Sequence, residues 1–287
     1  MTVATAWLIA LVELMVPPGN TAFSVHPAED CRGADVCEGG KWSTFYQTWV
    51  RQETADEGRE RYRTVILPAL ESTIEKLLCM RLDQSRVEGC TVDPDALDRK
   101  TKKQAMGPLT AASAMLGVIV NESGLREDVQ VGRGFAKACP KGSPEAIAGV
   151  CGPSDDGGRG RGPANECGLG QHHPQYAWMV ASIPEELRIR ARAGDKAARG
   201  EVCQTLMGTD RASVERSMEA TLRQLLRSKQ HCSWALRQSK IPVAWDYAMF
   251  SLYGINSCTS SNHGKTEKRV GTFRSLLFQM KRASKAS

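Results

Sequence analysis

Apolar residues recur at three- and four-residue spacing along much of this chain, which is the pattern of helices that bury one face. The clearest run spans residues 109–120 and ends in Asn121-Glu122-Ser123-Gly124, where Gly124 supplies a helix stop. Similar runs predict helices over residues 62–80, 212–226 and 244–252. Strand signals are scarce, so we expect a mainly α fold with a small irregular or β-containing lobe.

The N-terminal third of the chain contains a cluster of aromatic residues. Their spacing of three and four predicts a helix through Trp42, Phe45, Tyr46 and Trp49. An aromatic helix face usually packs into a core, and the alternative is a surface that stacks against carbohydrate. In the following helix, over residues 62–80, we expect Pro68 to interrupt the hydrogen bonding.

The end of the chain is strongly basic. Within residues 265–287 one acidic residue, Glu267, stands against seven basic ones: Lys265, Lys268, Arg269, Arg274, Lys281, Arg282 and Lys285. An apolar stripe follows the same segment at helical spacing: Val270, Phe273, Leu276, Leu277 and Met280. We expect this stripe to close a core while the basic side chains face solvent, and the alternative is peripheral contact with an anionic envelope surface. The chain carries a net charge of +6, but no aromatic-basic interleaving supports nucleic acid as a partner.

The ten cysteines indicate an oxidising compartment. No Cys-x-x-Cys pair occurs, so neither a zinc ribbon nor a thioredoxin-type site is expected. Ten cysteines instead suit five disulfides that staple an exported protein. Local closures are the simplest pairing, although spacing does not fix connectivity: Cys31–Cys37, Cys79–Cys90 and Cys139–Cys151.

Residues 4–16 form an apolar stretch that is too short to span a membrane and suits the core of a secretory signal. Glu13 interrupts the stretch and no basic residue precedes it. We expect residues 1–24 to be a signal peptide and the protein to be periplasmic or extracellular. Residues 25–105 would form an N-terminal helical region, and residues 106–287 the main domain with a Gly/Pro-rich insertion at 137–166.

Glu122 is the leading candidate for chemistry. A carboxylate at the end of an apolar helix lies at the edge of a core, where desolvation favours the protonated form. A carboxyl that is protonated near neutral pH can serve as a general acid. The alternative is an ordinary charged helix terminus.

Four segments follow one another in the order found in soluble lytic transglycosylases, which are relatives of goose-type lysozyme. Residues 114–124 resemble the helix and Glu-Ser motif of that family, and residues 168–177 resemble its Gly-Leu-Met-Gln segment. Residues 212–226 and 245–256 fall where the family has a helix and a Tyr-containing helix. The resemblance covers residues 105–260 and implies a lysozyme-like α+β fold, in which a helical bundle surrounds a substrate groove.

The chain departs from the family pattern in three places. Gly170 stands where the family usually has Met, and Asn256 follows Tyr253 by three positions where the family has Asn directly after Tyr. Glu122 and Gly168 are 46 positions apart, which is more than is typical. These departures affect the substrate preference of the groove more than the fold.

The resemblance implies cleavage of peptidoglycan strands between N-acetylmuramic acid and N-acetylglucosamine. Glu122 would protonate the glycosidic oxygen and then, ionised, accept the proton of the sugar's 6-hydroxyl as a 1,6-anhydro ring closes. This chemistry needs no metal or organic cofactor. By the same resemblance, the substrate contacts come from Ser123, Gly168, Leu169, Gln171 and Tyr253.

Other readings of the same residues remain open. A hydrolytic muramidase would need a second carboxylate to activate water, and the chain offers Asp128, Asp155, Asp156 and Glu166. A scaffold that binds peptidoglycan without cleaving it is a further alternative. The Ser123 hydroxyl could instead bond to helix backbone, and Tyr253 could be an ordinary buried tyrosine. We interpret His172 and His173 as groove-lining polar residues, because adjacent side chains diverge and no third metal ligand has suitable spacing.

Overall fold

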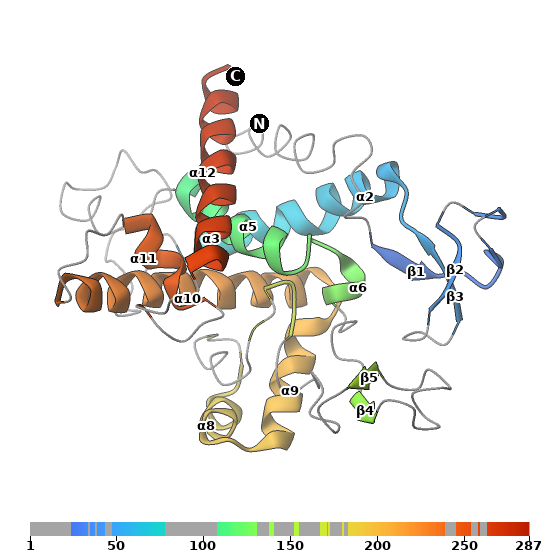
Figure 1. Cartoon of the computed structure of the whole chain (residues 1–287), viewed down its shortest axis with the longest axis horizontal. Helices are drawn as coiled ribbons and strands as arrows, with labels where there is room; N and C mark the ends of the chain where they lie inside the picture. The colour runs from blue at the N-terminus through green and yellow to red at the C-terminus, as the bar shows by residue number, and fades with distance from the viewer. Residues whose placement is uncertain are drawn as a thin grey trace.

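The computed structural model of the chain describes residues 24–33, 35–37, 39–43, 48–77, 108–130, 138–140, 152–154, 167–170, 172, 180, 183–238, 245–253, 258 and 263–286. Helices dominate these ranges, and a small antiparallel sheet lies at one end of the helical body (Figure 1). The expected mainly α fold with a small β lobe is therefore confirmed.

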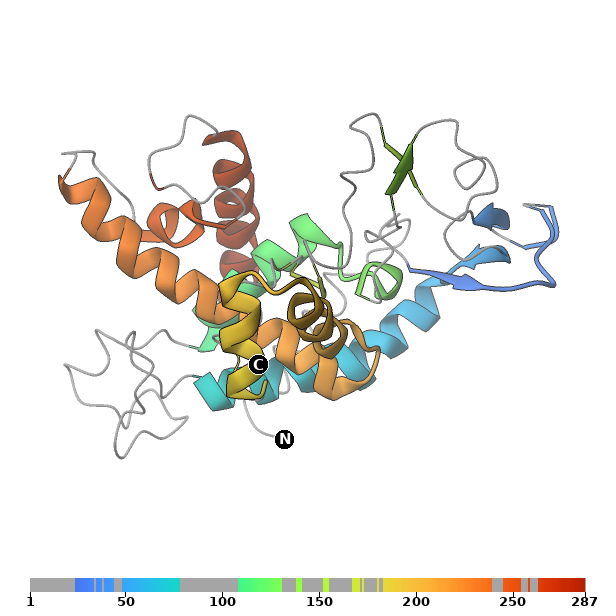
Figure 2. The same ribbon diagram turned by 90° about the horizontal axis from the view of Figure 1, so that it is seen from below.

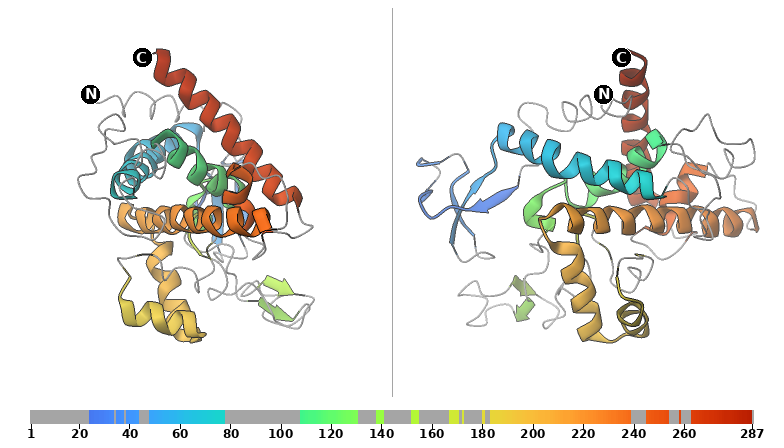
Figure 3. Two further views of the ribbon diagram at one scale, coloured as in Figure 1. Left: turned by 90° about the vertical axis from the view of Figure 1, so that its left-hand side faces the viewer. Right: turned by 180° about the vertical axis from the view of Figure 1, so that it is seen from behind.

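The helical body is built around α10 (Arg211–Gln238), the longest helix of the described residues. Two helices, α3 (Leu67–Leu77) and α5 (Pro108–Glu122), pack on one side of α10, and α12 (His263–Ala286) crosses α5 (Figure 1; Figure 3). One core joins all four helices, and it includes Leu70, Met115, Met218 and Leu276. The helix within residues 25–105 therefore shares its core with the helices that follow.

Shorter helices complete the body. The helix α11 (Trp245–Ser251) packs between α10 and α12, and α6 (Glu127–Gln130) follows α5 after one turn. On the other side of α10, α8 (Glu185–Ala193) and α9 (Lys196–Met207) pack against each other at a steep angle (Figure 1). This pair has its own core, which includes Leu187, Val202 and Leu206.

The helix α5 lies at the centre of the body because small and apolar residues surround its axis. Residues 111–119 are all buried in succession, so α5 is buried on every side and not on the one face that its spacing predicted. At Gly117 a Cβ atom would lie only 3.2 Å from the Cα of Phe273, so the missing side chain lets α12 cross closely. The predicted stop is confirmed, because Gly124 and Leu125 both adopt positive φ angles of 63° and 59°.

The predicted helix over residues 62–80 begins earlier than expected and is not interrupted at Pro68. A capping box between Thr54 and Glu57 starts α2 (Ala55–Arg61), which continues through the π-helical turn η1 (Tyr62–Ile66) into α3. Proline lacks an N–H and its ring crowds the carbonyl one turn earlier. The wider π turn directly before Pro68 accommodates both effects, so the helix continues.

The predicted aromatic helix over Trp42 and Trp49 is wrong, because both residues lie in strands. The sheet contains β1 (Val25–Pro27), β2 (Lys41–Ser43) and β3 (Thr48–Gln52) in the antiparallel order β1-β3-β2. Trp42 pairs directly with Trp49 across β2 and β3. A run of β-branched and aromatic residues at 48–50 was the strand signal, and it outweighs the helical spacing. Phe45 and Tyr46 lie outside the described residues.

The sheet extends from the helical body at the start of α2 (Figure 2). A second, two-stranded parallel pair joins β4 (Ala138–Pro140) to β5 (Gly152–Ser154). Both short strands fall within the expected insertion at 137–166, and the rest of that insertion lies outside the described residues.

Three disulfides are present in the described residues: Cys31–Cys37, Cys167–Cys203 and Cys232–Cys258. The first is one of the expected pairs and is confirmed, whereas the other two join cysteines for which no pairing was predicted. Cys79, Cys90 and Cys151 lie outside the described residues. The disulfides indicate an oxidising environment of the kind that exported proteins meet. Within the part of the chain that the structure describes, no helix combines the length and apolar character of a membrane span.

The apolar stripe near the C-terminus closes the core, as expected. Val270, Phe273, Leu276 and Met280 on α12 are all at most 6% exposed. Basic side chains cover the outer side of the same helix: Lys268, Arg274, Lys281 and Arg282. The packing of α12 against α5 positions the residues described next.

Candidate active site

An ion pair connects the end of α5 to α12. Both the Nε and the Nη2 of Arg269 donate to the Oε1 of Glu122, the former at 2.9 Å. The Glu122 side chain is 22% exposed and that of Arg269 only 6%. One side of the carboxylate therefore faces solvent, and its other side faces the guanidinium. The carboxylate thus has a charged hydrogen-bond donor from a distant part of the chain, which the apolar helix alone did not predict.

The same arginine contacts Tyr253, which lies two residues after the end of α11. Its Nη1 donates to the backbone carbonyl of Tyr253 at 2.7 Å, and its guanidinium carbon lies 5.5 Å from the centre of the Tyr253 ring. The second contact is a cation–π interaction. Arg269 therefore connects Glu122, the last residue of α5, to Tyr253, the tyrosine expected in the site.

Tyr253 in turn reaches the glycine-containing turn before α8. Its hydroxyl donates to the carbonyl of Gly170 at 2.6 Å in the interior of the protein. The structure thus connects three of the segments that resemble the transglycosylase motifs, through Glu122, Tyr253 and Gly170. Gln171 lies outside the described residues, so its side chain is not placed.

The turn formed by residues 167–170 is buried against α10. At Gly170 a Cβ atom would lie 2.5 Å from the Oγ1 of Thr221 and 2.7 Å from the hydroxyl of Tyr253. A side chain at position 170 would displace these groups, so the turn requires glycine here. Gly168 has a positive φ of 70° and is equally enclosed. The side chain of Leu169 is 1% exposed and belongs to the main core.

Ser123 has the plain structural role that the sequence left open. Its hydroxyl donates to the carbonyl of Ile119 at 3.0 Å, one turn back in α5, and the residue is 5% exposed. This contact is the backbone bond typical of serine near a helix end. The hydroxyl therefore does not point at Glu122 as an orienting group.

His172 is not a groove-lining residue, because it is buried at 2% exposure between α10 and Tyr253. Its Nε2 lies 3.1 Å from the carbonyl oxygen of Ser217 and its Nδ1 3.4 Å from the Oε1 of Gln224. Burial lowers the pKa of His172 to about 4 and keeps the ring neutral. Among the described residues no group of three His, Cys, Asp or Glu side chains is arranged to hold a metal ion.

Arg269 was missed in the sequence because it lies in a basic run that was assigned to solvent. Its register gave a signal: Arg269 is four residues before Phe273 and seven before Leu276, on the buried side of α12. An arginine on the apolar face of a helix must find a carboxylate or carbonyl partner. That requirement points to a buried ion pair.

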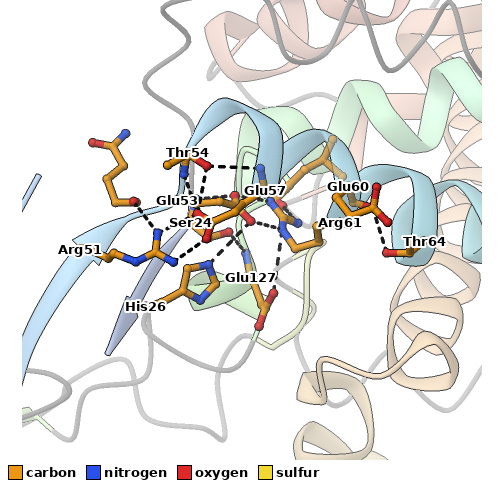
Figure 4. Close-up of polar contacts among 12 residues, drawn as sticks. Ser24, His26, Arg51, Glu53, Thr54, Glu57, Glu60, Arg61, Thr64 and Glu127 are labelled. Atoms are coloured by element: carbon orange, nitrogen blue, oxygen red, sulfur yellow. Dashed lines mark hydrogen bonds and ion pairs between the residues drawn. The ribbon is translucent and has the colours of Figure 1, made fainter. Parts of the chain in front are cut away.

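A second cluster of charges holds the loop that follows Glu122 (Figure 4). Arg61, at the end of α2, donates to the carbonyl of Leu125 at 2.7 Å and to the carboxylate of Glu53 at 2.7 and 3.0 Å. Glu53 also accepts from the backbone N–H of Ser24, and the hydroxyl of Ser24 accepts from the N–H of Glu127. We call Ser24, His26, Glu53, Arg61 and Glu127 the Arg61 cluster.

The charged groups of the Arg61 cluster lie close to one another. The His26 imidazole lies 3.7 Å from Glu53, and the Glu127 carboxylate 3.9 Å from Arg61. Burial by itself raises the pKa of the Glu53 carboxyl, but His26 and Arg61 outweigh that effect and hold it at about 2. The Glu53 carboxylate raises the pKa of His26, against the opposing effect of burial. The cluster thus fixes the sheet and the loop after Glu122 to the same helix.

Comparison of the chain with protein-family models, with curated proteins and with solved structures found no match. Any function proposed for the protein therefore depends on the contacts, distances and burial of the site residues.

Removing the Arg269 side chain should weaken the fold at the site. Arg269→Met leaves Glu122 and the Tyr253 carbonyl without their donor, and should lower the free energy of unfolding by about 2–4 kcal/mol. Urea denaturation measures this loss. In a double-mutant cycle with Glu122→Gln the two changes should not be additive, and strict additivity would contradict the ion pair.

A side chain at position 170 should disturb the packing between the turn and α10. Gly170→Ala places a methyl group against Thr221 and Tyr253, and should lower the free energy of unfolding by about 1–3 kcal/mol. Gly200→Ala is the matched control, because a Cβ atom there meets nothing within 4 Å. Equal thermal midpoints for the two variants would contradict the enclosed position of Gly170.

The Arg61 cluster should make the protein sensitive to acid. The pKa of Glu53 lies below its ordinary value of 4.5, so its contribution is complete above pH 4.5 and is lost as the pH falls towards 2. The loss is on the order of 3 kcal/mol. Urea midpoints measured from pH 5 to 2 should fall steeply in the parent and less steeply in Glu53→Gln. Asp56→Asn, at a side chain that is 94% exposed, should retain the parent slope.

Proposed function

We propose that this protein is a lytic transglycosylase that cleaves peptidoglycan between N-acetylmuramic acid and N-acetylglucosamine, with Glu122 as its acid and base. The observation that carries the proposal is the Arg269 connection. It links Glu122 to Tyr253 and, through the Tyr253 hydroxyl, to Gly170, although Glu122 and Arg269 are 147 positions apart. Those are the segments whose order resembles the transglycosylase family.

The proposed reaction proceeds in two steps. Glu122, when protonated, donates its proton to the glycosidic oxygen, and the bond from that oxygen to C1 of the muramic sugar breaks. The sugar's own acetamido oxygen stabilises the positive charge at C1, so no second carboxylate is needed. The 6-hydroxyl then attacks C1 while the Glu122 carboxylate accepts its proton, which yields a 1,6-anhydro sugar and restores the acid.

Arg269 has a defined role in this account. Its ion pair holds the Glu122 carboxyl in position. The first step requires the protonated carboxyl and the second step the ionised one. When the carboxyl is neutral, Arg269 keeps its contacts to the carbonyl and ring of Tyr253. Arg269 therefore keeps interaction partners whether Glu122 is protonated or ionised.

The cellular setting follows from the substrate. Peptidoglycan lies outside the cytoplasmic membrane, and the disulfides indicate an oxidising environment. Export by a signal peptide over residues 1–24 to the periplasm or the extracellular space agrees with both. The lysozyme-like arrangement of helices around a groove is part of the same proposal.

One observation favours a second candidate, a scaffold that binds peptidoglycan without cleaving it. The ion pair with Arg269 gives Glu122 a structural role, and the Ser123 hydroxyl is bonded to its own helix. A chain that had lost catalysis would still need Glu122 to satisfy the buried arginine.

Product analysis separates these candidates. Purified peptidoglycan is incubated with oxidised protein, and the soluble products are identified by mass spectrometry. The parent should release 1,6-anhydro-muropeptides, and Glu122→Gln should release at least about 100-fold less, because the acid and base are both lost. Asp56→Asn is the control, since it removes a carboxylate that is 94% exposed and outside the proposed mechanism, and should keep most of the activity.

Other outcomes would contradict the proposal in distinct ways. Products with ordinary reducing ends that vanish in Glu122→Gln would indicate hydrolysis by a muramidase. Retention of the folded parent on peptidoglycan without any soluble product would favour the scaffold.

A further inference from the structure

The exposed face of the N-terminal sheet carries a pair of tryptophans. Trp42 and Trp49 are directly opposite each other on β2 and β3, and their ring centres lie 6.2 Å apart in an edge-to-face arrangement. Trp42 is 53% exposed, although a tryptophan of this size is normally well buried. The Trp42 indole therefore does not fill a core, and its exposed surface is open to contact with a ligand.

Polar groups lie beside the tryptophans on the same face. Arg51 is two residues after Trp49 on β3, so both side chains project from one side of the sheet, and His26 is its cross-strand neighbour on β1. Arg51 donates to both carboxylate oxygens of Glu57, at 2.7 and 2.5 Å, and the two side chains are 31% and 44% exposed. The pair is fixed and still accessible at its outer edge.

This face is held rigidly with respect to the candidate active site. The Cys31–Cys37 disulfide closes the loop between β1 and β2, and the Arg61 cluster ties Ser24 and Glu53 at the ends of β1 and β3 to Arg61. Arg61 also donates to the carbonyl of Leu125, three residues after Glu122. A ligand bound on the sheet would therefore be held in a constant relation to the Glu122 loop.

The chemistry of this face matches a sugar chain. A pyranose ring presents a face of C–H groups that packs against an aromatic ring, and a rim of hydroxyl and acetamido groups that needs donors and acceptors. Trp42 and Trp49 offer the aromatic surface, and the Arg51–Glu57 pair offers both donors and acceptors at its edge.

We propose that the Trp42–Trp49 pair, with Arg51 and Glu57, is a binding site for a β-1,4-linked N-acetylhexosamine chain outside the cleavage centre. The inference rests on the proposed function for the identity of the polymer. A membrane surface is the weaker occupant, because a bilayer would have to desolvate the exposed carboxylate of Glu57. The site would hold a glycan strand while Glu122 acts on another part of it.

Calorimetric titration with tetra-N-acetylchitotetraose, a soluble β-1,4-linked chain, tests the site. The titration uses the Glu122→Gln protein, so that cleavage does not contribute. Adding Trp42→Ala should raise the Kd about tenfold, because the exposed stacking surface is lost. Trp42→Phe should recover most of the affinity. Phe278→Ala removes an aromatic that is 62% exposed on α12, and should leave the Kd unchanged.

Two results would overturn the site. One is an equal Kd for the Trp42→Ala protein and its parent, with thermal midpoints confirming that both are folded. The other is binding to phosphatidylglycerol vesicles that depends on Trp42 in a protein with no saturable affinity for the sugar, which would make the face a membrane contact.

The design keeps the site and the reaction separable. Loss of sugar affinity in Trp42→Ala, without anhydro products from the parent, would contradict only the proposed reaction. Anhydro products from the parent, without any effect of Trp42 on affinity, would contradict only the site.

Discussion

The buried guanidinium of Arg269 is the constraint around which the candidate site is organised. An arginine that is 6% exposed must be paired and hydrogen-bonded, because an isolated charge in the interior costs several kcal/mol. Its partners come from the end of α5 and from the turn after α11, while the arginine itself lies on α12. Satisfying one charge therefore fixes the relative positions of three helices, and with them Glu122 and Tyr253.

The opposite flank of Glu122 is held by a different arginine. Arg61 binds the Leu125 carbonyl and the buried Glu53 carboxylate, so the loop after α5 is fixed to α2 and to the sheet. Glu122 thus lies between two arginine networks that meet it from separate parts of the chain. Catalytic groups need such support, because small displacements of an acid or base cost much of its effect.

Periodicity predicted the helical elements well because it reports directly on which face is buried. The helices that contain Met115, Met218 and Phe273 follow their apolar spacing, and the Gly124 stop follows from the left-handed conformation that glycine accepts. The same rule failed at Trp42 and Trp49, since spacings of three and four cannot distinguish one helix from two strands joined by a hairpin. A different expectation, that proline would break the helix at Pro68, failed because a π turn accommodates it.

The candidate site could be predicted only in part, because its groups meet through contacts between distant segments. Glu122 and Tyr253 could be named from motif order, but their link depends on Arg269, whose charge made it resemble a solvent-facing residue. The roles of Leu169, Ser123 and His172 depend on burial, which spacing alone does not report for single residues in turns. Gly170 is explained only by what surrounds it.

The most direct test of the account is a crystal structure of the Glu122→Gln protein with a bound peptidoglycan tetrasaccharide. The account predicts a glycosidic oxygen within about 3 Å of the side-chain amide at position 122, with Arg269 still on the carbonyl and ring of Tyr253. A tetrasaccharide bound elsewhere, with position 122 enclosed by Arg269 and out of reach of every glycosidic oxygen, would contradict it.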